Sequence, residues 1–296
     1  MQDYALALCA LNLGFAPKNA LEFAAHIEAR VERAAGEGAK LLVIPEYAIE
    51  ACLAYKPEGL KPTQEMAFLA EEGAKVVEAL SALPARAGVH LLVGSMPMQT
   101  ELGLTNAAVL LTCDGRKIVQ DKLCLTPGER DPETWMLEGG QVLQTFDLDG
   151  LKTAILICLD VEMPALSCLL AREELDLLLV PSMTEMLSGY HRVFDCAKAR
   201  AVELMASVAV CGTVGATPGS TQMETNVSGC SLFVPCEESL GYKGVAASIA
   251  PTGGLNGEEP FLVASVPVAE VRALRRGKAE VWPGAWSADH ISIQPK

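Results

Sequence analysis

The sequence is poor in aromatic and in basic residues. Only 5% of its 296 residues are aromatic, and 23 Lys and Arg stand against 37 Asp and Glu, which gives a net charge of −14. Nucleic acids and anionic membranes are bound by basic surfaces, so this balance argues against both as partners. We expect an acidic, solvated surface and a small molecule as the partner.

The chain also lacks an apolar run of the roughly 18 residues that are needed to span a bilayer. Its first residues, MQDYALALCALN, have no basic segment and no small-residue cleavage site, so they do not resemble a secretory signal. They are typical of a first β-strand instead. The sequence therefore predicts a cytoplasmic protein without a membrane segment.

The ten cysteines include no Cys-x-x-Cys pair, which argues against zinc-ribbon and thioredoxin-like sites. Several of them, such as Cys9 and Cys211, stand in apolar segments, as small buried side chains do in a reducing compartment. The glycines of CGTVGATPG (211–219) do not form a Gly-x-Gly-x-x-Gly pattern before a helix, so they indicate a turn and not a phosphate site.

Alternating strands and helices dominate the chain. Strands are expected at 4–12, 40–45, 89–97, 175–181 and 207–214, and helices at 19–35, 63–87, 163–173 and 189–206. Asp-Gly pairs at 114–115 and 149–150 predict two hairpins. No linker rich in Pro, Gly or Ser divides the chain, so we expect one domain over residues 1–296, with a tail from about 270.

Two segments of the sequence are similar to each other. GAKLLVIPE (38–46) and ELDLLLVPS (174–182) both lead from a helix into an apolar strand that ends in proline and a polar residue. This similarity suggests two related halves. Hairpins combined with crossover helices predict mixed sheets with helices outside.

Reactive side chains stand at the ends of three predicted strands. Glu46 follows LLVIP, Lys122 follows KIVQD and Cys158 follows LKTAILI. Ligands of α/β folds bind at the carboxyl ends of strands, so these residues are candidates for one site. A cysteine nucleophile needs a base, and acyl transfer needs positive charge near the developing oxyanion. Glutamate and lysine can fill these two roles.

The segments IPEY, QDKLCLTPGERDPETW and ILICLDVEMP resemble, in order and spacing, the motifs of the nitrilase, or carbon–nitrogen hydrolase, superfamily. The resemblance covers residue 3 to about residue 270. It implies an α/β fold, a four-layer α-β-β-α sandwich, and a catalytic triad of Glu46, Lys122 and Cys158 with Glu129 as a second glutamate. It also implies hydrolysis of a small amide through a cysteine thioester, without a metal and without an organic cofactor.

The resemblance suggests substrate contacts as well. The backbone N–H of Leu159 would help to hold the oxyanion, and we expect four more side chains at the substrate: Glu162, Met183, Tyr190 and His191. Glu162 stands close to where related enzymes often carry an arginine, which weakens the case for an anionic substrate. A pairing of Glu162 with Arg200 is one way in which its charge could be balanced.

Several alternatives stay open at this point. A nitrile or a carbamoyl compound could be the substrate of the same triad, and a homologue could bind a small molecule or a partner protein without turnover. A Cys-His enzyme is disfavoured, because no papain-like or caspase-like sequence surrounds any cysteine. The family commonly forms dimers, so we expect a homodimer or a larger homo-oligomer. The segment VWPGAWSADH (281–290) would either pack across that interface or close the edge of the sandwich.

Overall fold

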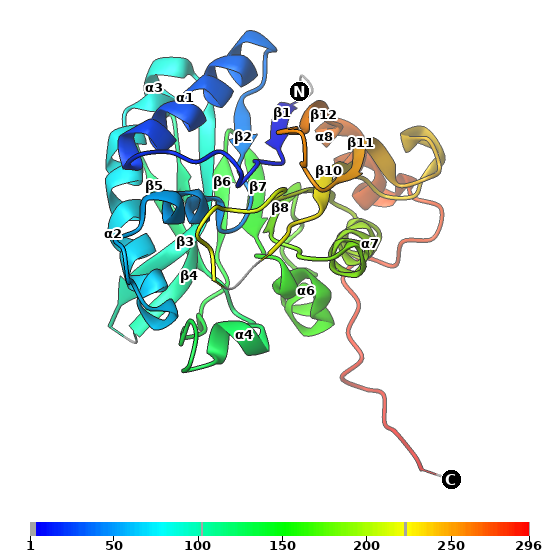
Figure 1. Cartoon of the computed structure of the whole chain (residues 1–296). Helices are drawn as coiled ribbons and strands as arrows, with labels where there is room; N and C mark the ends of the chain where they lie inside the picture. The colour runs from blue at the N-terminus through cyan, green and yellow to red at the C-terminus, as the bar shows by residue number, and fades with distance from the viewer. Residues whose placement is uncertain (1–3, 102, 222–223, 296) are drawn as a thin grey trace.

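The strands form two sheets that lie side by side in the centre of the molecule (Figure 1). The computed structural model describes residues 4–101, 103–221 and 224–295. The first sheet has the strand order β12-β1-β2-β3-β4-β5 and the second has the order β11-β10-β9-β8-β7-β6.

In the part of the chain that the structure describes, each sheet contains six strands. The first sheet contains β1 (Tyr4–Cys9), β2 (Leu41–Val43), β3 (His90–Thr100), β4 (Gly103–Leu111), β5 (Lys117–Asp121) and β12 (Phe261–Val266). The second contains β6 (Thr145–Leu148), β7 (Leu151–Ile155), β8 (Leu177–Ser182), β9 (Ser207–Gly212), β10 (Ser228–Phe233) and β11 (Val245–Thr252).

The two sheets share one topology. In the first, β1, β2 and β3 run parallel, and β12, β4 and β5 add antiparallel pairs on either side. In the second, β7, β8 and β9 run parallel, and β6, β10 and β11 add the antiparallel pairs. The two similar sequence segments lead into β2 and β8, which hold the same place in their sheets, so the prediction of two related halves is confirmed.

Helices cover the outer face of each sheet. On the first lie α1 (Ala20–Gly36), α2 (Pro62–Leu80) and α3 (Leu83–Ala87), and on the second α7 (Leu187–Glu203), with α6 (Pro164–Leu170) beside it (Figure 1). Successive side chains of β1 point to opposite faces of the sheet, which explains how the layers pack. Leu6 and Leu8 pack between the sheets, whereas Ala7 and Cys9 pack with the side chains of α1 and α2. The predicted α-β-β-α sandwich is confirmed.

Several predicted bounds differ from those of the structure. The helix expected at 63–87 divides into α2 and α3, and the helix expected at 163–173 begins at Pro164 and ends at Leu170. Proline lacks an N–H and is therefore favoured in the first turn of a helix, as at Pro84 in α3 and Pro164 in α6. The strand expected at 40–45 is paired only over Leu41–Val43.

Short elements complete the chain. They are η1 (Ala48–Tyr55), α4 (Pro127–Arg130), α5 (Leu159–Glu162), η2 (Glu238–Leu240), α8 (Val268–Ala273) and η3 (Leu274–Lys278). After η3 the chain passes along α6 and α7 and then leads away from the body of the molecule as an irregular tail (Figure 1). Within the described ranges, no helix is both long enough and apolar enough to cross a bilayer.

Candidate active site

Four of the predicted residues lie together at one end of the two sheets. Glu46 follows β2, Lys122 follows β5, Glu129 lies on α4 and Cys158 precedes α5. Their exposed fractions are 1%, 2%, 2% and 7%, so water has little access to any of them. The site therefore consists of ionisable groups that the fold has removed from solvent, which is a common property of catalytic sites.

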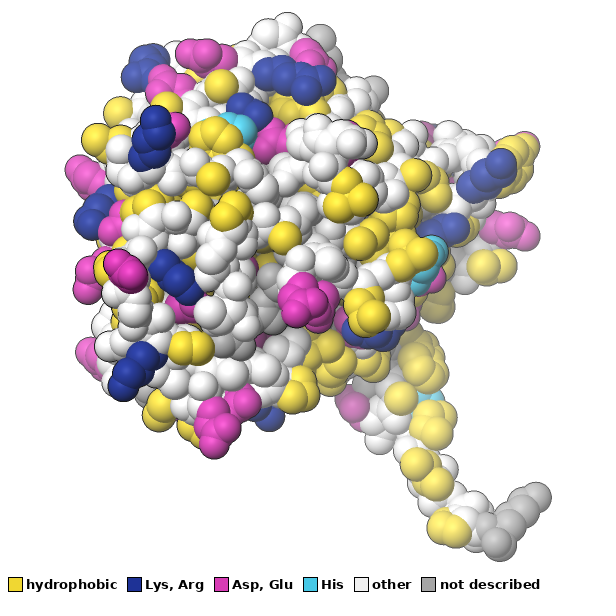
Figure 2. All heavy atoms as spheres, viewed as in Figure 1, with side chains coloured by type: hydrophobic (Ala, Val, Ile, Leu, Met, Phe, Trp, Pro, Cys, Tyr) yellow, Lys and Arg dark blue, Asp and Glu magenta, His cyan; other side chains and the backbone are white. Residues whose placement is uncertain are grey.

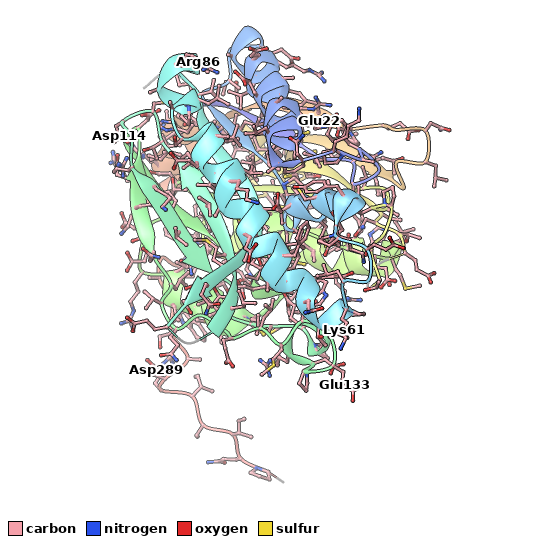
Figure 3. The ribbon with its side chains drawn as sticks, turned by 60° about the vertical axis from the view of Figure 1, so that its left-hand side comes forward. Glu22, Lys61, Arg86, Asp114, Glu133 and Asp289 are labelled. Atoms are coloured by element: carbon pink, nitrogen blue, oxygen red, sulfur yellow. The ribbon has the colours of Figure 1, made fainter. Side chains whose placement is uncertain are left out.

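Figure 3 shows which end of the molecule this is. Glu133, just after α4, and Lys61, just before α2, are labelled at one end, whereas Asp114, in the turn between β4 and β5, is labelled toward the other. Since β5 runs away from that turn, its last residues and Lys122 point to the end where α4 lies.

The Lys122 ammonium group is the centre of the network. Its Nζ donates a hydrogen bond of 2.8 Å to Oε1 of Glu46, and bonds of 2.9 Å and 2.8 Å to the two oxygens of Glu129. Asn106 on β4 donates from Nδ2 to the same two carboxylates, at 2.9 Å and 3.1 Å. Lys122 and Asn106 thus hold the two glutamates in fixed positions next to each other.

Glu129 is held by local bonds as well. Its Oε2 accepts from the backbone N–H of Thr126 at 2.8 Å, and its own N–H donates to Oγ1 of Thr126 at 3.2 Å. This reciprocal pair is a capping box, which is why the short helix α4 begins where it does. The hydroxyl of Tyr47 donates to Oε1 of Glu129 at 2.9 Å. Glu129 is therefore fixed by its own helix and by the residue that follows Glu46.

The backbone is strained at two of these positions. Cys158 has φ 48° and ψ −107°, and Tyr47 has φ 51°, a region that non-glycine residues rarely occupy. Such conformations cost about 1–3 kcal/mol each and concentrate at functional sites. The carboxylate of Asp160 supports the turn at Cys158, because it accepts from the N–H groups of Ile157, Leu123 and Cys124 at 2.7–3.1 Å.

The electrostatic surroundings drive the pKa values of the two glutamates apart. Burial raises the pKa of Glu46, and the charge of Glu129 raises it further against the opposite effect of Lys122. The pKa of Glu129 is lowered in spite of burial, because Lys122 and the bonds from Thr126 and Asn106 favour its charged form. Two carboxyl groups with opposed shifts can take different roles, one as a proton carrier and one as a permanent anion.

The Cys158 thiol lies beside these charges. Its Sγ donates to the backbone carbonyl of Met183 at 3.4 Å. Burial raises the pKa of Cys158 well above its usual value; Glu46, which is within hydrogen-bonding reach, raises it further, and Lys122 lowers it. In the absence of a substrate the thiol therefore keeps its proton, and Glu46 is the group positioned to accept it.

The other residues that were predicted to contact the substrate do not all lie at the cluster. Met183 is buried and contacts Cys158 through its carbonyl, while Tyr190 on α7 is buried against Phe194, with ring centroids 4.1 Å apart. Leu159 begins α5, directly after the nucleophile candidate. His191 is not brought to the cluster, since 60% of its side chain is exposed and it lies 4.0 Å from Asp195.

The suggested ion pair between the Glu162 carboxylate and Arg200 is wrong. Glu162 pairs with Nε of Arg192 at 3.3 Å, whereas Arg200 pairs with Glu203 at 2.7 Å and donates to the backbone carbonyl of Val161. Arg192 stands about two turns nearer to the start of α7 than Arg200 does. The charge of Glu162 is balanced in either case.

Sequence reasoning missed Asn106 and Tyr47. Asn106 could have been noticed as a polar residue that opens the apolar run AAVLL, and Tyr47 as the aromatic neighbour of Glu46. Across the residues that the structure describes, no group of three or more His, Cys, Asp or Glu side chains could hold a metal ion.

Comparisons with known proteins agree on one family. The family model for carbon–nitrogen hydrolases matches residues 5–276. The probable hydrolase YhcX of Bacillus subtilis is 29% identical over 230 residues, which are 78% of this chain and 44% of that protein. The omega-amidase NIT2 of Danio rerio is 29% identical over 169 residues, which are 54% of this chain and 57% of that protein. The chain thus spans about half the length of the curated relatives it matches.

Solved structures resemble the fold over nearly its whole length. XC1258 from Xanthomonas campestris, a CN-hydrolase superfamily protein, has a TM-score of 0.71 at 17% identity and covers 93% of this chain and 95% of its own. An amidase from Nesterenkonia sp. has a TM-score of 0.67 at 22% identity and covers 91% of this chain and 92% of its own. At these identities the likeness establishes the sandwich fold.

Proposed function

The chain belongs to the carbon–nitrogen hydrolase family, and we propose that it hydrolyses the carbon–nitrogen bond of a small amide through a thioester on Cys158. The observation that carries this proposal is the buried cluster in which Lys122 joins Glu46 and Glu129 beside the Cys158 thiol. A nucleophile, a proton carrier and a fixed cation are the groups that acyl transfer requires.

The reaction begins with proton transfer from Cys158 to Glu46. The thiolate attacks the amide carbonyl carbon, and the Lys122 ammonium and the N–H of Leu159 stabilise the oxyanion. Glu46 gives its proton to the leaving amine as the carbon–nitrogen bond breaks. Glu46 then takes a proton from water, whose oxygen attacks the thioester carbonyl and releases the acid and the thiol.

The opposed pKa shifts support this division of roles. The raised pKa of Glu46 suits a group that takes and returns a proton near neutral pH. The lowered pKa of Glu129 keeps this group ionised, so that Lys122 remains charged and stays in place. Glu129 would therefore hold Lys122 in position and help to raise the pKa of Glu46.

Amide hydrolysis is favoured over related reactions because two of the proteins that match are called amidases. A nitrile or a carbamoyl compound would use the same four residues, so the cluster alone does not select among them. Arg192 lies 3.3 Å from the carboxylate of Glu162, so an arginine is present there and the sequence argument against an anionic substrate no longer applies.

Release of ammonia from a panel of amides, nitriles and carbamoyl compounds tests the proposal. Wild type should release ammonia from at least one amide, Cys158→Ala should release none, and intact-mass measurement should find an acyl adduct only in proteins that carry Cys158. Cys211→Ala, which changes a buried thiol in β9, is the matched control and should keep the wild-type rate. Equal release by wild type and Cys158→Ala would contradict the role of Cys158.

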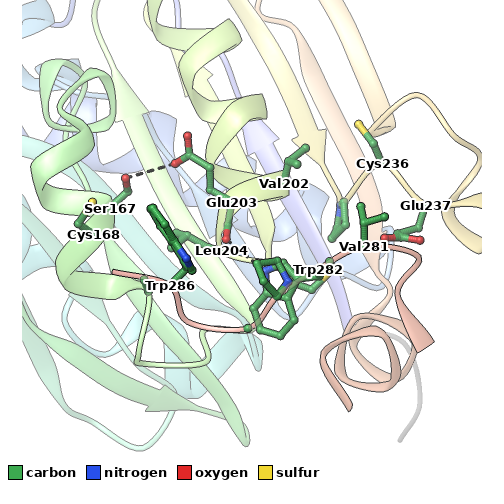
Figure 4. A pocket seen from close by; sticks show the side chains of 15 residues that line it. Ser167, Cys168, Val202, Glu203, Leu204, Cys236, Glu237, Val281, Trp282 and Trp286 are labelled. Carbon is green, nitrogen blue, oxygen red and sulfur yellow. Dashed lines mark hydrogen bonds between the residues drawn. The ribbon is translucent and has the colours of Figure 1, made fainter. Parts of the chain in front are cut away.

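We also propose a cytoplasmic homodimer. The ten cysteines are free, in agreement with a reducing compartment. Exposed apolar side chains lie on α6, α7 and the tail, namely Leu169, Val202, Val281 and Trp286, and Figure 2 shows hydrophobic atoms along the tail. A cavity of about 410 Å³ lies between the tail and the two helices, with Trp282 and Trp286 at its wall (Figure 4).

An exposed apolar face of this kind is typical of an interface. Light scattering should give twice the monomer mass, and Val202→Glu should lower it to the monomer mass. Leu21→Glu on α1, which is also exposed, is the matched control. A monomer mass for wild type would contradict the proposed dimer.

A further inference from the structure

Glu50 is a buried carboxyl group close to Glu46 that the proposed reaction does not use. It lies on η1, where its N–H donates to the carbonyl of Tyr47 at 2.9 Å, and only 1% of the residue is exposed. Its carboxyl group lies within electrostatic range of Tyr47, the residue that follows Glu46. Glu50 therefore belongs to the surroundings of the catalytic cluster and not to the outer surface.

The carboxyl group of Glu50 stands out because one of its oxygens lacks a hydrogen-bond partner. Its Oε2 is buried and accepts no hydrogen bond from any described residue. Glu65, also buried, is bonded to Lys56 at 2.5 Å and to Thr221 at 3.0 Å. Glu72 is bonded to Tyr55 at 2.6 Å and to a lysine of its own helix. The other buried glutamates near η1 are thus satisfied.

An unpartnered buried acceptor is costly. Leaving such a group without a hydrogen bond destabilises the fold, and more so if the group is charged, so an exception of this kind calls for an explanation. Solvent cannot supply the missing donor, because the residue is almost fully covered. Glu46 acts on Glu50 and is equally covered, so a ligand that reaches the catalytic cluster can supply this donor.

The local charges indicate what kind of donor is missing. Burial raises the pKa of Glu50 to about 8, with smaller contributions from the carboxylates of Glu65 and Glu46. The cation nearest to the reaction, Lys122, is already shared by Glu46 and Glu129. This side of the site is therefore rich in carboxyl groups, and a positive charge would be favoured there.

We propose that Glu50 binds an ammonium group of the substrate, so that the enzyme prefers small amides that carry a protonated amine a few bonds from the scissile carbonyl. This inference rests on the proposed amide hydrolysis and names its substrate class. Below pH 8 the carboxyl group of Glu50 is protonated in the empty site. Binding of the ammonium converts it to a carboxylate and releases one proton to the solvent.

Two amides of equal length test this preference. They are 5-aminopentanamide and hexanamide, in which a methyl group replaces the ammonium. The wild-type kcat/KM should be at least about 10-fold higher for the amine, because only the amine can donate a charge-assisted hydrogen bond to the Glu50 carboxylate. In Glu50→Gln the ratio should fall to about one. Glu72→Gln, which changes a buried glutamate with its own partners, is the control and should keep the wild-type ratio.

A binding measurement separates failure of this inference from failure of the proposed function. Calorimetry of 5-aminopentanamide with Cys158→Ala in two buffers of different ionisation enthalpy should report proton release, which should be lost in Cys158→Ala/Glu50→Gln. Hydrolysis of hexanamide without any preference for the amine would overturn the role of Glu50 and leave amide hydrolysis intact. Glu50-dependent proton release without hydrolysis of any amide would overturn the function and retain the ammonium site. No binding of the amine would overturn the inference.

Discussion

Strands β2 and β8 hold the same place in the two sheets but end differently. Leu41 begins β2 and Leu177 begins β8, and each strand runs parallel to both of its neighbours. However, β2 is paired over three residues and β8 over six. The first strand leads to the buried Glu46, whereas the second continues as a regular strand to Ser182.

The neighbouring strand explains this difference. β3 has a register shift between Leu92 and Ser95, and Gly94 within it has φ 85°. A Cβ atom at Gly94 would lie 2.1 Å from the carbonyl oxygen of Pro45, so only glycine allows the chain after β2 to turn where it does. In β9 the corresponding residue is Cys211, which pairs with Pro181 in regular register.

The comparison extends to the nucleophile. Leu8 in β1 and Ile155 in β7 occupy matching register positions, so Cys158 and Leu11 each stand three residues further along. Leu11 is fully buried. One scaffold is thus used twice, with Glu46, the proposed proton carrier, at a strand end of one half and the Cys158 thiol at a strand end of the other. Reactivity depends on the strand ends and not on the shared topology.

The largest loss of activity should come from replacing the polar side chain that follows β2, whereas a similar replacement at the end of β8 should have little effect. Glu46→Gln should lower kcat/KM by about 10²–10⁴, because it removes the group that carries the proton. Ser182→Ala, at the corresponding place, should change it little, since among the described residues its hydroxyl donates only to the carbonyl of Val180, at 3.4 Å. Steady-state kinetics of both variants with one amide substrate would measure the two losses of kcat/KM. Similar losses in both would mean that the two ends do not differ in function.

The next effect concerns the turn after β2. Gly94→Ala should lower the free energy of unfolding by about 2–4 kcal/mol, because the added Cβ meets a backbone oxygen that cannot easily move. It should also lower kcat by displacing Glu46. Cys211→Ala, at the matching position in β9, should cost only about 1 kcal/mol. Urea unfolding measures both, and equal losses would disprove the special role of Gly94.

Burial of Glu50 should make stability depend on pH. Its pKa of about 8 in the folded protein lies above its ordinary value of 4.5, so the folded state holds a proton that the unfolded chain releases. This contribution is fully present below pH 4.5 and is lost as the pH rises through 8. Between pH 6 and 8, wild type should lose roughly 2 kcal/mol relative to Glu50→Gln, at ~1.4 kcal/mol per pH unit.

Urea unfolding of both proteins at pH 6 and pH 8 measures this difference. The corresponding residue after β8, Met186, is exposed and cannot titrate, so Met186→Gln should show the wild-type pH dependence. A wild-type pH dependence in Glu50→Gln would mean that Glu50 is already ionised at pH 6.

The smallest effect is a shift of the pH profile. Glu46 must be ionised to accept the thiol proton, so kcat/KM should fall as the pH decreases through its raised pKa. Because the charge of Glu129 contributes to that raised pKa, Glu129→Gln should move the acidic limb to lower pH. An acidic limb that stays in place would show that Glu129 does not act on Glu46.

Much of the fold and part of the site follow from local sequence. Apolar periodicity and Asp-Gly pairs place the strands and hairpins, since these signals arise between residues close in the chain. The positions of Glu46, Lys122 and Cys158 at strand ends could be predicted for the same reason. The true end of β2 could not, because it depends on a close approach between Gly94 and Pro45 from separate strands.

Only the tertiary structure decided which groups meet. Asn106 reaches Glu46 across 60 residues and Tyr47 reaches Glu129 across 82, and neither contact leaves a local signal. The same holds for Glu162, whose partner is Arg192, and for Glu50, whose unpartnered oxygen is visible only once every neighbour is in place. Sequence determined which reactive groups are available, through periodicity and motif. Packing determined their charge states and partners, because desolvation and hydrogen bonding depend on residues that are distant in the chain.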